Sequence, residues 1–303
     1  SKIMYDIVII GAGPAGLTAG IYAGRAGLNT IILDASRSGG TVNTAPLIEN
    51  YPGIDKIPGE KLMKSMTEQT SQYTEIKERT KVKSIEKLDD GSFNINTRNE
   101  TYNAHYVIIG TGSNPVTLPA EGVEEFTGRG VSYCAVCDGT FFVGQDVLVI
   151  GGGNSAATEA LYLNRIGVKC SMVHRRDKLR CDAKLQEDIN NAGINIYWNS
   201  ELKAVKGNGR VEEAIIYNKV DDEEISVKVN GIFIAIGYHP NNELALGLDI
   251  LCDDSGYIIT DENMKTSVDG VYAAGDLTGG VKQIVVSAAQ GAKAATRIQE
   301  LLL

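Results

Sequence analysis

The sequence predicts an α/β fold built from two Rossmann-like (three-layer ββα) nucleotide-binding domains, with the second inserted into the first. Two observations carry this prediction. A unit of strand, glycine turn, helix and strand occurs twice, over residues 5–34 and 146–174. Each copy is followed by another buried strand that runs into a glycine turn, at 106–112 and 231–237. A parallel sheet buried on both faces has this pattern, and a repeated unit favours two nucleotide sites over one.

The first unit opens with a short β-branched strand at residues 6–10, which is typical of a strand covered on both faces. After the glycine turn, we expect a helix from about Pro14 to Ala26. A second strand over residues 30–33 ends at Asp34.

The second unit repeats this plan in the same register. A strand is expected at 146–150, a helix at 154–166 and a second strand at 169–173, which ends at His174. From Gly11 to Asp34 and from Gly151 to His174 there are 23 positions in each case.

The remaining segments predict how the chain passes between the two domains. Alternating apolar and polar residues over 80–110 predict antiparallel strands within the first domain. Pro115 and Pro240 each follow a glycine turn, so the crossings are expected near them. Residues 271–276 and a helix from about Ser287 return to the first domain. We therefore expect a discontinuous domain of residues 1–115 and 243–303 and an inserted domain of residues 116–242.

The first glycine turn has the spacing of a dinucleotide fingerprint. Gly11 permits the tight turn, Gly13 lets the backbone approach a pyrophosphate, and Gly16 lets helix and strand pack closely. Asp34 can accept hydrogen bonds from ribose hydroxyls and would repel a 2′-phosphate, so FAD or NAD is expected here rather than NADP. The alternative is a glycine turn that binds no dinucleotide.

The second fingerprint has Gly151, Gly153 and, at its third position, Ala156. The place of the ribose-binding acid is taken by a basic segment. Guanidinium groups bind phosphate bidentately, so this site should prefer NADP; the alternative is a solvated basic cluster. The segment consists of His174, Arg175 and Arg176, with Arg180 just beyond.

Cys134 and Cys137 lie between the two fingerprints. Two cysteines at this spacing can close a small disulfide and lower one another's pKa, which favours a redox dithiol. A zinc site would need four ligands, and the sequence has no second CxxC or paired-histidine spacing, so we expect no metal; an inert buried pair is the other alternative. Asp138 could move protons for the dithiol, or it could be a turn residue before Gly139.

Charge and composition exclude several other classes. The formal charge is −9 and the pI is near 5.0, which argues against nucleic-acid binding. No apolar run approaches the roughly 20 residues that span a bilayer. The first strand begins almost at once, which leaves no room for a secretory signal, and five cysteines make an odd number. A cytoplasmic protein is therefore expected.

The chain resembles the low-molecular-weight thioredoxin reductases of bacterial and archaeal type over essentially its full length. The matching segments are GAGPAG at 11–16, ENYPG at 49–53, SYCAVCDG at 132–139, GGGNSA at 151–156, HRRD at 174–177 and YAAGD at 272–276. The CxxCDG segment just before the second fingerprint is the most specific of them.

This resemblance implies an NADPH-dependent flavoprotein that reduces the disulfide of thioredoxin or a thioredoxin-like protein. A hydride would pass from NADPH to FAD, and the flavin would reduce the disulfide. Cys137 would face the isoalloxazine, Cys134 would attack the partner disulfide, and Asp138 would serve as acid and base. Family members move the NADPH domain during turnover and are usually homodimers.

The resemblance also supplies the candidate cofactor contacts. FAD would lie against Gly11, Gly13, Pro14, Ala15, Gly16, Asp34, Gly39, Gly40, Asn50, Thr111, Gly112, Gly275, Asp276 and Gln283. NADPH would lie against Gly151, Gly153, Asn154, Ser155, His174, Arg175, Arg176 and Arg180.

The chain departs from the family pattern in two places. Thr41 and Val42 stand where Gln-Leu is usual, so only Gly39 and Gly40 are carried over there. Lys282 stands where Arg is commoner, which keeps the charge but loses the planar fork.

Three other functions stay open on the sequence. They are a reductase for a different redoxin or a peroxide-reducing partner, a flavin- and nucleotide-sensing binding protein with a structural CxxC, and a ferredoxin–NADP-type reductase.

Overall fold

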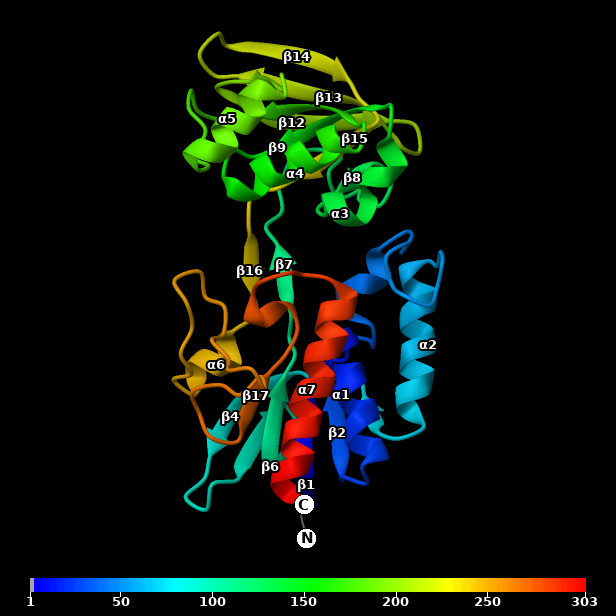
Figure 1. Ribbon diagram of the computed structural model, residues 1–303, viewed down its shortest axis with the longest axis vertical. Coiled ribbons are helices and arrows are strands. Elements are labelled where there is room, and N and C mark those ends of the chain that lie inside the picture. Colours follow the sequence, from blue (N-terminus) through cyan, green and yellow to red (C-terminus); the bar gives the residue numbers. More distant parts are fainter. Residues whose placement is uncertain (1–2) are drawn as a thin grey trace. The chain divides into compact units, whose positions relative to one another are not determined.

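The computed structural model describes residues 3–303, and the chain divides into two compact units. Unit 1 consists of Ser1–Asn114 and His239–Leu303, and unit 2 consists of Pro115–Tyr238. The chain passes between the units through β7 (Ser113–Pro115) and β16 (Tyr238–Pro240), which pair as a two-stranded ribbon (Figure 1).

Unit 1 is built on a seven-stranded sheet in the order β3-β2-β1-β6-β5-β4, with β17 also paired to β6. The strands β1, β2, β3, β6 and β17 run parallel, whereas β4 and β5 are antiparallel to their neighbours. Their bounds are β1 Met4–Ile10, β2 Thr30–Leu33, β3 Glu75–Lys77, β4 Val82–Lys87, β5 Phe93–Thr97, β6 Thr101–Ile109 and β17 Val271–Ala273.

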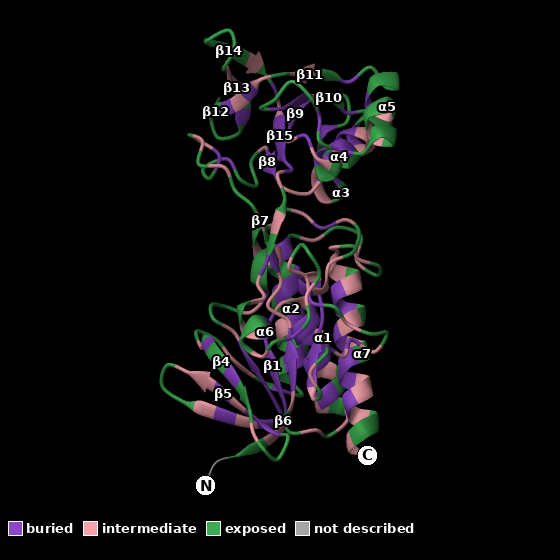
Figure 2. Ribbon diagram, turned by 90° about the vertical axis from the view of Figure 1, so that its left-hand side faces the viewer, coloured by how far each residue is buried: buried purple, intermediate pink, exposed green. Residues whose placement is uncertain are grey.

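Both faces of this sheet are buried, because alternate residues of β1 belong to different cores. Ile7 and Ile9 pack with apolar residues of α1, α2 and α7, while Val8 and Ile10 pack with residues of β4, β5 and α6 (Figure 2). The helices are α1 Pro14–Arg25, α2 Gly59–Ser71, α6 Glu243–Gly247 and α7 Ile284–Leu302, and the 3₁₀ segments are η1 Gly40–Thr44 and η3 Asp276–Thr278.

Unit 2 repeats the arrangement on a five-stranded parallel sheet in the order β11-β10-β9-β15-β8. Val147 and Val149 of β9 pack against α4, and Leu148 and Ile150 pack against the antiparallel strands β12 and β13. The bounds are β8 Val131–Ser132, α3 Ala135–Asp138, η2 Gly139–Phe142, β9 Asp146–Ile150, α4 Asn154–Arg165, β10 Lys169–Val173, α5 Ala183–Asn191, β11 Asn195–Tyr197, β12 Ser200–Gly207, β13 Val211–Asn218, β14 Glu223–Lys228 and β15 Gly231–Ile234.

The predicted α/β fold with two Rossmann-like units is confirmed, and several elements match to the residue. The strands at 30–33, 146–150 and 169–173 and the starts of α1 and α4 lie where the sequence predicts them. The helix expected from about Ser287 begins three residues earlier, at Ile284. The antiparallel strands expected over 80–110 are present, but β6 pairs antiparallel with β5 on one edge and parallel with β1 on the other.

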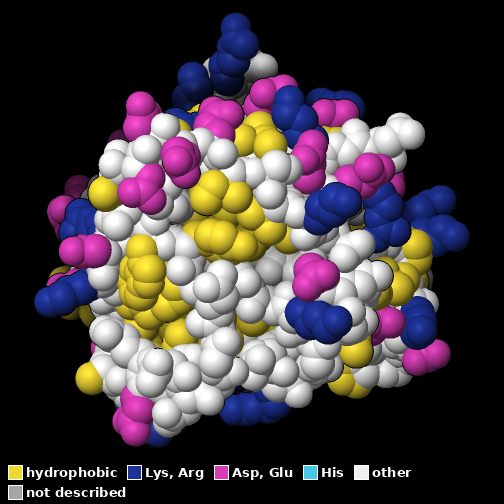
Figure 3. Space-filling view, turned by 90° about the horizontal axis from the view of Figure 1, so that it is seen from above, with side chains coloured by type: hydrophobic (Ala, Val, Ile, Leu, Met, Phe, Trp, Pro, Cys, Tyr) yellow, Lys and Arg dark blue, Asp and Glu magenta, His cyan; other side chains and the backbone are white. Residues whose placement is uncertain are grey.

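Surface features of the described chain agree with its composition. In the view of Figure 3, acidic and basic side chains are interspersed over the face seen from above. Within residues 3–303, no helix combines the length and the apolar character that crossing a bilayer requires.

Candidate functional site

The first glycine turn joins β1 to α1. At two of its three fingerprint glycines the surrounding backbone leaves no room for a side chain, and at the third it does. Gly11 has a left-handed φ of +106°, and a Cβ there or at Gly16 would overlap a backbone carbonyl oxygen, of Gly110 and Gly11 respectively. Gly13 is different, because a Cβ there would meet no atom of the described chain within 4 Å. Space held open at the N-terminus of a helix suits the phosphate groups of a dinucleotide.

Asp34 is held beside this turn at the carboxyl end of β2. Its Oδ2 accepts the Ala12 N–H (2.8 Å) and its Oδ1 accepts the Ser36 N–H (2.8 Å). Each carboxylate oxygen has more than one lone pair, so both can still accept a hydroxyl. The fixed orientation fits a ribose.

Gly39 and Gly40 fold back onto the same turn. The Gly39 N–H donates to the Ala12 carbonyl (2.7 Å), and a Cβ on Gly40 would lie 3.7 Å from the Gly13 Cα. Both have positive φ, +111° and +62°, which only glycine adopts at little cost. The structure therefore brings these predicted residues together with Gly13.

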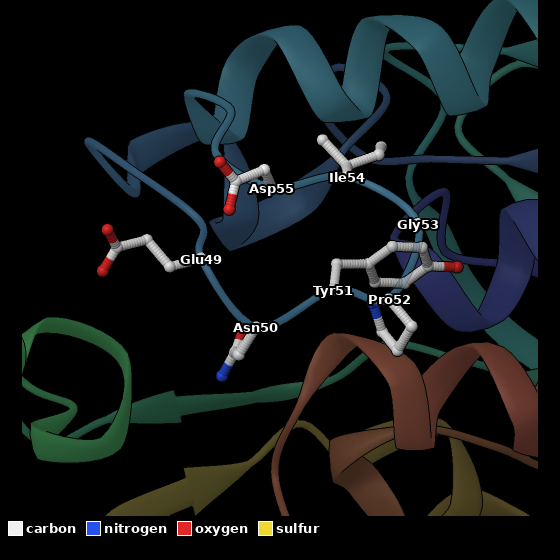
Figure 4. Close-up of a pocket in the computed structure, with 7 residues that line it drawn as sticks. All are labelled: Glu49, Asn50, Tyr51, Pro52, Gly53, Ile54 and Asp55. Atoms are coloured by element: carbon white, nitrogen blue, oxygen red, sulfur yellow. The ribbon is translucent and has the colours of Figure 1, made fainter.

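Asn50 and Gln283, which lie far apart in the sequence, are hydrogen-bonded through Nδ2 and Oε1 (3.0 Å). Gln283 is the residue before α7, and Asn50 belongs to the loop 49–55, which lines an open hollow of about 410 Å³ (Figure 4). Two polar side chains predicted to contact FAD thus form one group.

Asp276 lies between the end of β17 and the start of α7. Burial raises the pKa of its carboxyl, and a hydrogen bond from the Ser287 hydroxyl (3.3 Å) opposes that shift. The preceding Gly275 has a φ of +90° and donates its N–H to Gln290 Oε1 (2.7 Å). A Cβ on Gly275 would come within 3.1 Å of the Ala15 side chain, so this turn packs on the start of α1.

Thr111 and Gly112, two of the predicted FAD contacts, are hydrogen-bonded to Asn241. The Thr111 hydroxyl donates to the Asn241 carbonyl (2.6 Å), Asn241 Nδ2 donates to the Thr111 carbonyl (2.9 Å), and the Asn241 N–H donates to the Gly112 carbonyl (3.0 Å). These bonds join the two chain segments next to the crossing ribbon.

The second glycine turn joins β9 to α4 in the same way. Gly151 has a φ of +138° and lies against the Ala235 carbonyl, whereas a Cβ on Gly153 would meet no atom of residues 3–303 within 4 Å. The turn borders a hollow of about 640 Å³ at the carboxyl ends of β9, β10 and β15. Its lining includes Leu118–Ala120, Ile150–Gly152, Val173–Arg175, Arg180, Ser200–Lys203 and Ile236.

The charge of the predicted basic segment comes from its arginines. Arg175 and Arg180 line the hollow, and the Arg180 N–H donates to the Gly152 carbonyl (2.8 Å). His174 is buried, its Nε2 donates to the Lys178 carbonyl (2.6 Å), and burial lowers the pKa of its ring. Neutral His174 therefore shapes the segment, and Arg176 is exposed outside the lining of the hollow.

Asn154 and Ser155 begin α4 in different surroundings. Asn154 is bonded to Asp182, which precedes α5, through Nδ2 to Oδ2 (3.2 Å) and through the Asp182 N–H to Oδ1 (2.8 Å). Ser155 is exposed at the first turn of the helix.

Cys134 and Cys137 form a disulfide with a Cα–Cα distance of 5.3 Å. Cys134 caps α3, and its sulfur accepts the Cys137 N–H (3.2 Å). The Cys134 N–H donates to the Ser132 hydroxyl (3.1 Å). Val136 between the two cysteines keeps 50% of its surface exposed, so solvent reaches this segment.

Asp138 ends α3 with its carboxyl largely buried. Ser132 Oγ donates to Oδ2 (2.6 Å), and the buried Oδ1 has no hydrogen-bond partner within the described chain. Burial raises the pKa of this carboxyl more than the Ser132 bond lowers it. A carboxyl whose pKa is raised by burial and that lies beside a dithiol can act as a general acid.

Comparison with known proteins agrees with this arrangement. A family model described as pyridine nucleotide-disulphide oxidoreductase matches residues 5–291. The thioredoxin reductase of Peptoclostridium acidaminophilum is 40% identical over 98% of this chain and 96% of its own length, and that of Listeria monocytogenes is 42% identical over 98% and 93%.

Solved structures agree as well. The crystal structure of thioredoxin reductase from Streptococcus pyogenes superposes with a TM-score of 0.95 at 40% identity, covering 100% of this chain and 99% of that one. Thioredoxin reductase from Giardia duodenalis has a TM-score of 0.92 at 35% identity and covers 99% of each chain.

The chain belongs to the pyridine nucleotide-disulphide oxidoreductase family, among the thioredoxin reductases. In this thioredoxin reductase homologue, sequence reasoning missed two side chains at the dithiol, Ser132 and Glu159. Ser132 precedes Cys134 by two residues and bonds to both Cys134 and Asp138. Glu159 of α4 accepts the Ala135 N–H on Oε1 (2.9 Å). A serine beside the motif was a weak signal, and nothing in the sequence connected Glu159 with it.

A Gly13→Ala substitution tests whether the open space at the first turn holds a ligand. The fold should tolerate it, since the backbone there is extended (φ −84°, ψ −170°) and the Cβ meets no atom of the described residues. FAD affinity should fall by roughly tenfold or more, about 1.4 kcal/mol, measured by flavin titration of the apoprotein. Gly16→Ala should instead lower the melting temperature itself. A Gly13→Ala protein that purifies yellow with unchanged flavin affinity would contradict the assignment.

Glu159 should make the stability of unit 2 depend on pH. Burial raises the pKa of Glu159 from 4.5 to about 7, so the folded chain holds a proton that the unfolded chain loses above pH 4.5. Stability must therefore fall as pH rises from about 4.5 to 7. Between pH 5 and 8 the wild type should lose about 2 kcal/mol relative to Glu159→Gln. Urea unfolding followed by Trp198, the only tryptophan in the sequence, reports unit 2; equal pH slopes would refute the prediction.

Proposed function

We propose that this protein is an NADPH-dependent flavoprotein that reduces the disulfide of thioredoxin or a thioredoxin-like protein. The observation that carries the proposal is a disulfide beside a buried carboxyl, in the same unit as the second dinucleotide turn. The Ser132 side chain is hydrogen-bonded to Cys134 and to Asp138, and Cys134 is joined to Cys137 by the disulfide. All four residues lie within a stretch of seven positions in the sequence. The thioredoxin reductases that the chain resembles support the choice of partner.

Unit 1 is assigned to FAD. The open space at Gly13, the oriented carboxylate of Asp34 and the Asn50–Gln283 pair support this assignment. A pyrophosphate would lie at the start of α1, and the ribose hydroxyls would bond to Asp34. When bound, FAD accepts a hydride from NADPH and supplies an electron pair to a disulfide.

Unit 2 is assigned to NADPH. The matching open space at Gly153 would receive the pyrophosphate, and Arg175 and Arg180 at the edge of the hollow would bind the 2′-phosphate. Lys203 lines the same hollow, where its Nζ lies 4.0 Å from the Glu201 carboxylate.

The reduced dithiol would transfer two electrons to the disulfide of the partner protein by thiol–disulfide exchange. The Cys134 thiolate attacks one sulfur of the partner disulfide, and the partner's other sulfur leaves as a thiolate that takes the proton of Asp138. Cys137 then gives its proton to the Asp138 carboxylate and, as a thiolate, attacks the Cys134 sulfur, which releases the second partner thiolate and re-forms the Cys134–Cys137 disulfide. The Cys137 N–H at the Cys134 sulfur stabilises negative charge there, which makes Cys134 the suited nucleophile.

Two further features of the family are included in the proposal: a homodimer and a location in the cytoplasm. Both rest on the resemblance to thioredoxin reductases.

Replacing one cysteine at a time separates this activity from the alternatives. In Cys134→Ser, NADPH-driven reduction of a thioredoxin should fall by at least about a thousandfold, since no nucleophile remains for the partner. NADPH should still bleach the flavin, because the hydride step does not use this thiol. Stopped-flow absorbance and an insulin-coupled thioredoxin assay measure the two steps. Disulfide reduction at the wild-type rate would exclude the proposed function.

The arginines that line the hollow should determine the preference for NADPH over NADH. Arg175→Ala with Arg180→Ala should raise the KM for NADPH roughly 10- to 100-fold, since a charge-assisted hydrogen bond contributes about 1.5–3 kcal/mol. The KM for NADH should change far less. Lys184→Ala, at an exposed position of α5, is the matched loss of a surface charge. Equal effects on both cofactors would show that these arginines do not bind the 2′-phosphate.

A further inference from the structure

Glu159 lies on a different helix from the two cysteines and binds the chain between them. We call residues 132–138 the dithiol segment. The Oε1 of Glu159 accepts the N–H of Ala135, the first residue of α3, at 2.9 Å, and Ala135 is only 1% exposed. Glu159 belongs to α4, the helix that begins at the second glycine turn. A buried N–H that lost this acceptor would remain unpaired, which is unfavourable in a folded protein.

Three further hydrogen bonds are internal to the segment. The Cys134 N–H donates to Ser132, the Cys137 N–H donates to the Cys134 sulfur, and the Asp138 N–H donates to the Cys134 carbonyl. The Ser132 hydroxyl also donates to Asp138 Oδ2 (2.6 Å) and so ties α3 to β8, while the Glu159 bond ties α3 to α4.

Packing brings α3 and α4 together at the other end of the segment. A Cβ on Gly139 would come within 2.9 Å of the Leu163 side chain and 3.2 Å of Ile166. Contact at Gly139 sets the distance between the two segments. Because apolar contact does not fix rotation, the hydrogen bond to Ala135 is what orients α3 on α4.

We propose that Glu159 is a positioning residue of the dithiol, which keeps the Cys137 N–H aimed at the Cys134 sulfur after the disulfide has been reduced. The inference rests on the proposed function for its biological use, but the positioning itself needs neither a nucleotide nor a redoxin. In the reduced protein the two sulfurs no longer share a covalent bond. Without the Glu159 anchor at Ala135, the single turn of α3 can unwind, and Cys134 then loses the donor that favours its thiolate.

Since Glu159 both accepts a hydrogen bond and carries a carboxyl, two kinds of replacement separate the two properties. Glu159→Gln keeps an oxygen that can accept the Ala135 N–H and removes the ionisable group. Glu159→Leu and Glu159→Ala remove both. If positioning is the role, the glutamine variant should behave like the wild type and the other two should not.

The experiment measures the reactivity of Cys134 in the full-length, flavin-loaded protein. The protein is reduced with a phosphine without NADPH, freed of reductant and exposed to iodoacetamide at pH 7.5. Alkylation of each cysteine is followed by peptide mass spectrometry. The other three thiols serve as internal references: burial raises the pKa of Cys170 to about 11 and raises the pKa of Cys181 and Cys252.

We expect the Cys134 rate to fall at least fivefold in Glu159→Leu and Glu159→Ala and to stay within twofold of wild type in Glu159→Gln. Glu187→Leu and Glu187→Gln, at an exposed position of α5, are the matched controls and should change nothing. Wild-type rates in the leucine and alanine variants would overturn the proposal. Equal losses in all three Glu159 variants would overturn it as well, because they would make the charge responsible.

Cys170 also reports whether unit 2 stays folded. It lies on β10, and its thiol donates to the Ala160 carbonyl of α4 (3.3 Å), so local unfolding would expose it to alkylation. A lower alkylation rate of Cys134 is attributed to lost positioning only in a variant whose Cys170 stays unlabelled. Labelling of Cys170 in both the leucine and the alanine variant would show that Glu159 supports the fold of the unit, and would refute a specific positioning role. The outcome is independent of whether any redoxin is reduced, so failure here is distinguishable from failure of the proposed function.

Discussion

The close approach of backbone to backbone at the two glycine turns is the constraint on which the rest of the structure depends. Gly11 lies against the Gly110 carbonyl and Gly151 against the Ala235 carbonyl, both at positive φ, where a side chain would collide. Each contact brings a strand end, the start of a helix and the next strand of the sheet to one point. The open position at Gly13 or Gly153 lies two residues further on. A helix N-terminus with free N–H groups is thus presented at the carboxyl edge of both sheets, where an anionic ligand is stabilised.

In unit 2, helix α4 begins at the glycine turn and also supports the segment that carries Cys134 and Cys137. The first turn of α4 belongs to the nucleotide fingerprint, its middle carries Glu159, and its last turn packs Leu163 against Gly139. One helix therefore carries both the proposed nucleotide turn and the contacts that support the disulfide. This shared support explains why the CxxC segment needs only a four-residue helix: the segment takes its rigidity from α4 and from Ser132 rather than from its own length.

The sequence predicted the parts of the structure that local pattern determines. The β-branched runs at 30–33, 146–150 and 169–173 became strands with those bounds, because burial on both faces of a parallel sheet requires such runs. Ser132 and Glu159 were not predicted, since their importance arises when β8, α3 and α4 meet. The far wall of the second hollow, with Leu118 and Lys203, was missed for the same reason. His174 was grouped with the arginines by adjacency; its side chain is buried, whereas Arg175 and Arg176 are exposed.

Two carboxyl groups with raised pKa values, Asp138 and Glu159, lie at opposite ends of α3. Each is held by a neutral donor, Asp138 by the Ser132 hydroxyl and Glu159 by the Ala135 N–H, and burial outweighs that bond in both. Each costs stability at neutral pH, because folding must either keep a proton on it or bury its charge. A segment that needed only a stable turn would not require either group. A dithiol that exchanges protons while it exchanges electrons does require one of them. In the proposed mechanism the two carboxyl groups therefore divide the work, since Asp138 would exchange the proton and Glu159 would keep the sulfurs in place.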